Sequence, residues 1–105
     1  MPQFDVHRNP SAATREAIPY VVDIQSDLLS DLGTRLTLPL ARAEHMPAVG
    51  PRSLCPIFPV DGESLLLLPH LAAAFRTRDL GRAVGSLSGH ANAFATAIDV
   101  VFSGV

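Results

Sequence analysis

Side chains able to do acid–base, nucleophilic or metal chemistry are sparse in this chain and stand apart from one another. The four histidines, at positions 7, 45, 70 and 90, fall into no spacing typical of a metal site, and Cys55 is the only cysteine. The segment "SLSGHA" brings serine, glycine and histidine together but lacks the turn sequence that exposes a nucleophilic serine, so we expect it to cap a helix. The sequence therefore predicts no metal, no cofactor and no catalytic residue, and it favours surface positions for all four histidines.

Charged residues also form no recognisable binding motif. All eight basic residues are arginines, which excludes a phosphate-binding loop that ends in lysine. The net charge of −2 argues against a broad nucleic-acid surface, and the arginines show no clustering that predicts a site. Asp23, Asp27 and Asp31 recur every four residues, but they cross from a predicted strand into a turn, where we expect solvated, turn-forming carboxylates.

Length and composition predict one small domain that associates with a copy of itself. The 105 residues are 48% apolar and only 17% charged, which leaves little polar surface to cover the domain and favours a homodimer. A single cysteine predicts a buried structural thiol in a reducing compartment. The N-terminus has no basic region followed by an apolar core, and no apolar run is long enough for a membrane span, so we expect a cytoplasmic protein without membrane contact.

Alternating apolar residues predict short strands at 3–7, 20–26 and 34–40, with a mobile loop between the first two. Two apolar runs around Asp61-Gly62 predict a tight hairpin. Pro56 and Pro59 cannot donate to a strand ladder, which predicts that the first strand of this hairpin lies at a sheet edge or carries a bulge. Residues 70–87 fit either helix or strand.

The clearest element is a C-terminal helix of about fifteen residues that begins near Ser88. Ser86 or Ser88 can cap its start. Apolar residues at helical spacing form one stripe along it: Ala91, Phe94, Ala95, Ile98, Val101 and Phe102. Many short strands followed by one helix predict a mainly β or α+β domain that resembles a barrel.

Three segments, "YVVDIQSDLLSDLGTRLTLPL", "PVDGESLLLLP" and "FATAIDVVFSGV", together resemble the CcdB family of toxins from bacterial type II toxin–antitoxin modules, which serve plasmid maintenance. The resemblance runs from residue 3 to residue 105. It implies an SH3-like barrel of the CcdB, Kid and MazF type, with a small subsidiary sheet and one C-terminal helix. It also implies a homodimer without enzymatic activity that inhibits the topoisomerase DNA gyrase by binding its A subunit. A disordered segment of a CcdA-like antitoxin would neutralise the toxin, and without antitoxin we expect no direct binding of nucleic acid.

The resemblance also implies which residues face gyrase: Gln3, Phe4, Ser26, Leu28, Leu29, Asp99, Phe102, Ser103, Gly104 and Val105. Ile98, Val101 and Phe102 are the expected dimer interface. Three positions depart from the better-known members, which carry tryptophan at Ser103, asparagine at Asp99 and tyrosine at His7.

Each of these residues also has a plainer interpretation. Phe4 fits the barrel core better than a partner surface. Leu28 and Leu29 lie in a turn, which slightly favours exposure to a partner. Phe102 and Val105 could instead bury against the second subunit.

Two further functions remain open beside the gyrase inhibitor. Ser103 favours a non-toxic or retargeted relative that still binds antitoxin and acts as a decoy. A ribonuclease of the Kid and MazF kind would need an acid–base set, for which Arg15, Arg35, Asp23 and His90 are candidates without supporting spacing.

Overall fold

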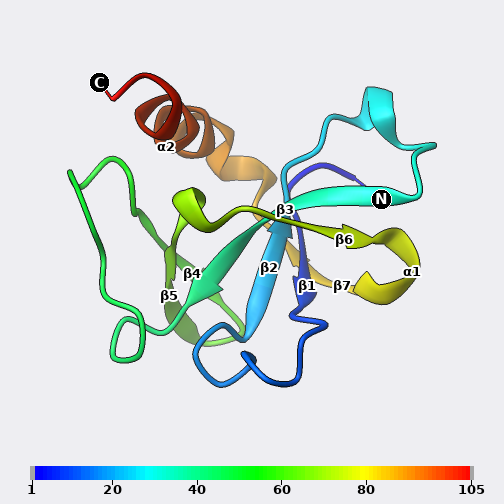
Figure 1. Cartoon of the computed structure of the whole chain (residues 1–105), viewed down its shortest axis with the longest axis horizontal. Helices are drawn as coiled ribbons and strands as arrows, with labels where there is room; N and C mark the ends of the chain where they lie inside the picture. Colours follow the sequence, from blue (N-terminus) through cyan, green and yellow to red (C-terminus); the bar gives the residue numbers. More distant parts are fainter. Residues whose placement is uncertain (1, 105) are drawn as a thin grey trace.

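The computed structural model describes residues 2–104, which form a strongly curled antiparallel sheet with one longer helix at the C-terminal end (Figure 1). The strands are β1 (Asp5–Arg8), β2 (Tyr20–Asp23), β3 (Thr34–Ala41), β4 (Ile57–Val60), β5 (Glu63–Leu67), β6 (Ala73–Arg76) and β7 (Ala83–Ser86). The helices are α1 (Thr77–Leu80) and α2 (Ala91–Ser103), with three single 3₁₀ turns, η1 (Asp27–Leu29), η2 (Pro69–Leu71) and η3 (Ser88–His90).

The curl of the sheet comes from β3, which pairs with two different strands along one of its sides. The strand order is β4-β5-β3-β2-β1-β7, with β6 branching from β3. The first half of β3 pairs with β6, from Thr34 opposite Arg76 to Thr37 opposite Ala73, whereas its last residues, Leu40 and Ala41, pair with β5. The result is a half-barrel consistent with the expected SH3-like fold, in which the β6 branch takes the place of the subsidiary sheet.

The Asp61-Gly62 hairpin is confirmed. Both residues have positive φ, 50° and 81°, as a tight two-residue turn between right-handed strands requires. The hairpin joins β4 to β5, and β4 lies at one end of the strand order. The edge position predicted from Pro56 and Pro59 is therefore also confirmed.

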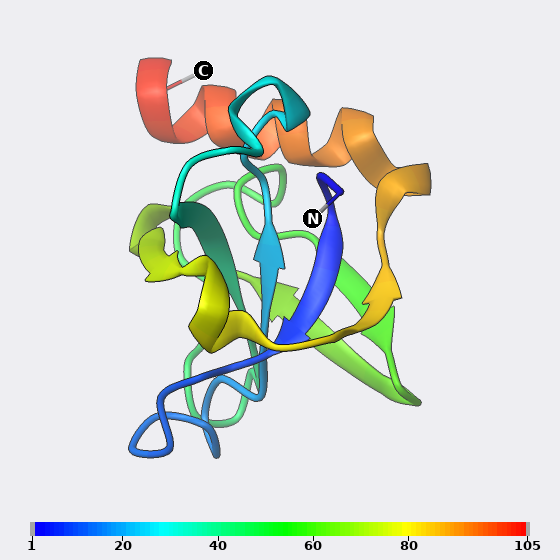
Figure 2. The same cartoon turned by 90° about the vertical axis from the view of Figure 1, so that its right-hand side faces the viewer.

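Both faces of the central strands are buried. The inner face carries the apolar core, in which Val6, Val22 and Leu38 pack with Phe58 and Phe94. The β6–α1–β7 segment crosses the outer face (Figure 2). The buried residues of the opposite strand parity belong to this outer face: His7, Val21, Asp23, Arg35, Thr37 and Pro39. Val21, Thr37 and Pro39 also line a small pocket with residues of the 9–19 loop.

The surface position predicted for His7 is wrong, because its side chain is 1% exposed on this covered outer face. Cys55 is buried as predicted. The first strand begins later than expected, because Phe4 has a φ of 70° and cannot continue the extended strand. Residues 70–87 contain both strand and helix, namely β6, α1 and β7.

Helix α2 has 13 residues and turns a different face inward from the one predicted. Its buried residues are Phe94, Ala97 and Val100, so only Phe94 of the expected apolar stripe points into the barrel. The predicted serine cap is wrong, because the N-cap residues of η3 and α2 are Leu87 and His90 and neither makes a capping hydrogen bond through its side chain. The Ser86 hydroxyl accepts a hydrogen bond from the Ser88 N–H just before η3. Within residues 2–104, neither α1 nor α2 is long and apolar enough to cross a bilayer.

Candidate interaction surface

A buried ion pair between neighbouring strands β2 and β3 holds the segment that follows β2. Arg35 Nε donates to Asp23 Oδ2 at 2.7 Å, and both side chains are almost fully buried. Asp23 Oδ1 accepts the Gln25 N–H at 2.9 Å, and Arg35 Nη2 donates to the Gln25 carbonyl at 3.0 Å. The pair therefore fixes the backbone of Gln25 from both sides.

The side chain of Gln25 in turn closes the loop that contains η1. Its Nε2 donates to the carbonyls of Leu29 at 3.2 Å and Thr34 at 3.1 Å. Its Oε1 accepts the Leu36 N–H at 2.9 Å. The Gln25 side-chain amide thus connects the start of the loop to η1 and to strand β3.

Two further hydrogen bonds set the conformation of η1 itself. Ser26 Oγ accepts the Leu28 N–H at 3.2 Å, which caps the turn. The Gln3 N–H donates to Asp27 Oδ1 at 2.9 Å, and the Gln3 side chain donates to the Ile24 carbonyl at 3.0 Å. These bonds hold the turn in a conformation that leaves Leu28 94% exposed and Leu29 47% exposed.

The end of α2 is the second part of the predicted surface. Phe102 is 92% exposed, and Gly104 takes a left-handed φ of 77° while its N–H donates to the Val100 carbonyl. This capping bond orders the chain up to residue 104. The Ser103 hydroxyl donates to the Asp99 carbonyl at 2.8 Å, so it is turned back onto the helix. Val105 lies outside the described residues.

Phe4 serves the core, as the plainer interpretation favoured. Its ring stacks on Phe94 with 5.0 Å between centroids, and Phe94 stacks on Phe58 at 4.9 Å. Its backbone joins two elements, because the Phe4 N–H donates to the Asp23 carbonyl and the Phe4 carbonyl accepts the Leu87 N–H. Phe4 therefore anchors the N-terminus beneath the helix.

The structure brings η1 and the end of α2 to the same end of the molecule but does not join them. Both project at the top of Figures 1 and 2, and in Figure 1 they lie on opposite sides of that end. Leu28 and Phe102 are therefore two separate apolar projections in a single chain.

The sequence matches the family described as CcdB protein over residues 3–104, which is nearly the whole chain. The chain belongs to the CcdB family. Family membership identifies it as a toxin-type component of a toxin–antitoxin system, whose partner in general is an antitoxin. The resemblance based on three sequence segments is thereby confirmed.

In this CcdB-family chain the residues considered for ribonuclease activity do not form a site facing solvent. Asp23 and Arg35 are buried against each other. His90 packs edge-on against Phe58 at the start of α2, with 5.0 Å between ring centroids. Arg15 lies in the loop at the other end of the barrel, where its Nε donates to the Asn9 carbonyl. The solvated turn position predicted for Asp23 is wrong, and the ion pair with Arg35 was therefore not predicted.

Proposed function

We propose that this CcdB-family protein acts in the bacterial cytoplasm as a non-enzymatic toxin that binds the A subunit of DNA gyrase and is neutralised by a CcdA-like antitoxin. The proposed gyrase surface comprises the two apolar projections with their supporting residues. Leu28, Leu29 and Phe102 make contact, Gln3, Phe4 and Ser26 hold the N-terminal part, and Asp99, Ser103, Gly104 and Val105 complete the C-terminal part.

The observation that carries this proposal is the exposure of Leu28 and Phe102, 94% and 92%, on backbone held by hydrogen bonds. Large apolar side chains held rigidly in solvent are typical of partner surfaces, because an anchor that is already ordered loses little entropy on binding. The Gln25 bonds and the Gly104 cap supply that order at the two ends of the surface.

A second copy of the chain accounts for the separation of the two projections. The outer stripe of α2 exposes Ile98 by 37%, Val101 by 47% and Phe102 by 92%. We propose that this stripe packs against its counterpart in a homodimer, so that an interface with two-fold symmetry places the C-terminal ends of both chains side by side. The gyrase surface would then be composite, with one η1 turn on each side of the paired ends.

Calorimetric titration of the purified protein with a gyrase A fragment tests this function. We expect Leu28→Ser to weaken binding by roughly tenfold or more, because truncation of a buried anchor costs at least about 1.4 kcal/mol. Ile57→Ser is the matched control, since Ile57 is also an exposed aliphatic residue, 65% exposed, but lies on the edge strand β4. Equal affinity of both variants and the wild type would refute the assigned surface.

The decoy function has one observation in its favour. Ser103 offers no large side chain, and its hydroxyl is engaged with the Asp99 carbonyl. A chain that binds a CcdA-like antitoxin peptide but not the gyrase fragment in the same titration would be a decoy.

A further inference from the structure

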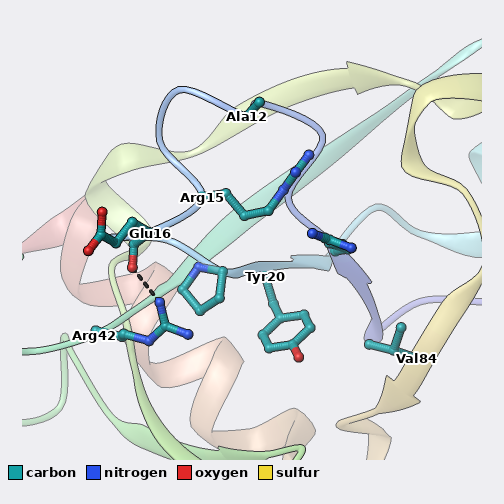
Figure 3. Close-up of a pocket in the computed structure, with 8 residues that line it drawn as sticks. Ala12, Arg15, Glu16, Tyr20, Arg42 and Val84 are labelled. Atoms are coloured by element: carbon teal, nitrogen blue, oxygen red, sulfur yellow. Dashed lines mark hydrogen bonds between the residues drawn. The ribbon is translucent and has the colours of Figure 1, made fainter.

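Three of the eight arginines gather around one pocket, although the sequence showed no such cluster. The pocket has a volume of about 590 Å³ and lies at the end of the barrel opposite α2, where the 9–19 loop meets the ends of several strands. Figure 3 shows Arg15, Arg42 and Tyr20 around this open space. The lining residues are Arg8, Ala12, Arg15, Glu16, Pro19, Tyr20, Arg42 and Val84.

Two of the guanidinium groups are fixed by carbonyl acceptors. Arg15 Nε donates to the Asn9 carbonyl at 2.9 Å, and its Nη2 donates to the Pro10 carbonyl at 3.4 Å. Arg42 Nη1 donates to the Glu16 carbonyl at 2.6 Å. A guanidinium group has five N–H donors, so Arg15 keeps donors for a ligand while its position is already set.

Two carboxylates near the pocket bond to Arg42 and to Tyr20 rather than to Arg8 or Arg15. Arg42 binds Glu63 through both of its oxygens, at 2.9 and 3.2 Å, and Asp61 accepts the Tyr20 hydroxyl at 3.2 Å. The Glu16 carboxylate points away from Arg15 in Figure 3. Within residues 2–104, Arg8 and Arg15 form no ion pair.

The pairing register of β1 with β2 places Arg8 beside the same pocket. It is the cross-strand partner of Tyr20, and neighbours in such a pair project to the same face of the sheet. Arg8 is exposed and forms no hydrogen bond through its side chain with the residues that the structure describes. Two positive groups, one rigid and one adjustable, therefore border a polar pocket of the size that small ligands occupy.

We propose that this arginine pocket binds the phosphate group of a small anionic ligand. Arginine forks match the oxygens of phosphate in a bidentate geometry, and a phosphate that carries up to two charges matches two guanidinium groups outside any ion pair better than one carboxylate does. The Tyr20 ring and Val84 line the pocket beside them and could pack against a flat organic group attached to the phosphate. The site does not depend on gyrase binding and lies away from the surface proposed for it.

Calorimetry on the full chain with inorganic phosphate, adenosine monophosphate and free glutamate tests the site. We expect both phosphate compounds to bind at millimolar concentration and glutamate to bind more weakly. Tighter binding of the nucleotide would assign the ligand as a phosphate ester with a ring, and equal binding would assign free phosphate. Failure of both phosphate compounds to bind would overturn the proposal, as would glutamate binding as tightly as phosphate.

Variants distinguish phosphate binding in the pocket from nonspecific attraction of the anion to exposed arginines. Arg8→Gln and Arg15→Gln should each weaken phosphate binding by roughly tenfold, since a charge-assisted hydrogen bond is lost. Arg78→Gln is the matched control, because it removes one exposed arginine from α1 and should leave the affinity unchanged. Arg8→Gln removes no side-chain hydrogen bond or ion pair that the structure shows within residues 2–104, so its result stands even if Arg15→Gln loosens the loop. Unchanged binding in Arg8→Gln and Arg15→Gln would refute the assignment.

Discussion

Replacing Asp23 by leucine tests whether the buried ion pair organises the η1 turn. The substitution removes the carboxylate that Arg35 Nε contacts at 2.7 Å and leaves a guanidinium group that is 1% exposed. Removal of one partner from a buried pair costs about 3–5 kcal/mol, because the other charge stays desolvated. The same change deprives the Gln25 N–H of its acceptor. We therefore expect Asp23→Leu to lower the free energy of unfolding by about 4 kcal/mol, a large part of the stability of a small domain.

A double-mutant cycle separates the pair from its surroundings. With Arg35→Leu added, neither charge of the pair remains, and apolar replacements of whole buried pairs are often neutral or stabilising. The double variant should therefore be more stable than Asp23→Leu alone, with a coupling energy of about 2 kcal/mol or more. Urea unfolding gives the free energy of unfolding of the wild type, the two single variants and the double variant. An unchanged slope of this free energy against urea concentration would verify two-state behaviour.

The same variants report on the function of the pair. Loss of the Asp23 and Arg35 bonds to Gln25 should free its side chain, so the Leu36 amide that binds Gln25 Oε1 should exchange faster with deuterium. A loss of less than about 1 kcal/mol in Asp23→Leu would show that the charges are not desolvated. Protection of Leu36 that matches the wild type would show that the pair does not hold the turn.

Two further substitutions probe the proposed surfaces, and a third probes the Arg42–Glu63 ion pair. Val101→Glu places a charge on the outer stripe of α2 and should shift the protein toward monomer in sedimentation; a wholly dimeric variant would put the interface elsewhere. Ser103→Trp adds a rigid aromatic surface beside Phe102 and should strengthen binding of the gyrase fragment about tenfold in calorimetry, whereas an unchanged affinity would exclude Ser103 from the contact. A hydrogen bond from Arg42 lowers the pKa of Glu63 below its usual 4.5. The pair therefore stabilises the fold above that pH and loses its effect as the pH falls through the lowered value, so the stability difference between wild type and Glu63→Gln should vanish in acid.

Local patterns were sufficient to predict one hairpin and one edge strand of this fold. Asp61-Gly62 predicted the hairpin because few other residues accept two successive positive φ angles. Pro56 and Pro59 predicted the edge strand because proline cannot donate to a neighbour. Each of these features depends on residues within one short segment, and no knowledge of distant packing was needed.

Predicting the buried ion pair also required knowing that both faces of the sheet are covered. Strand alternation already places Asp23 and Arg35 on the face opposite Val22 and Leu38. The sequence did not reveal that this second face is covered, because residues 70–87 fitted helix and strand equally well. Once β6, α1 and β7 cross that face, His7 and the ion pair become interior residues, and the acidic residue predicted to be solvated becomes a structural one.

The orientation of α2 follows from side-chain size, which links the fold to the proposed dimer. Apolar residues lie on more than one side of this helix, so periodicity alone could not choose the buried side. The barrel takes the side with Ala97, 0% exposed, whose small side chain lets the helix axis approach the sheet closely enough for Phe94 to reach Phe58. Larger Ile98 and Val101 are left outside by the same choice. Two apolar faces on one helix thus leave one partly exposed in the part of the chain that the structure describes, and a second copy of the same helix would offer it a surface of matching chemistry.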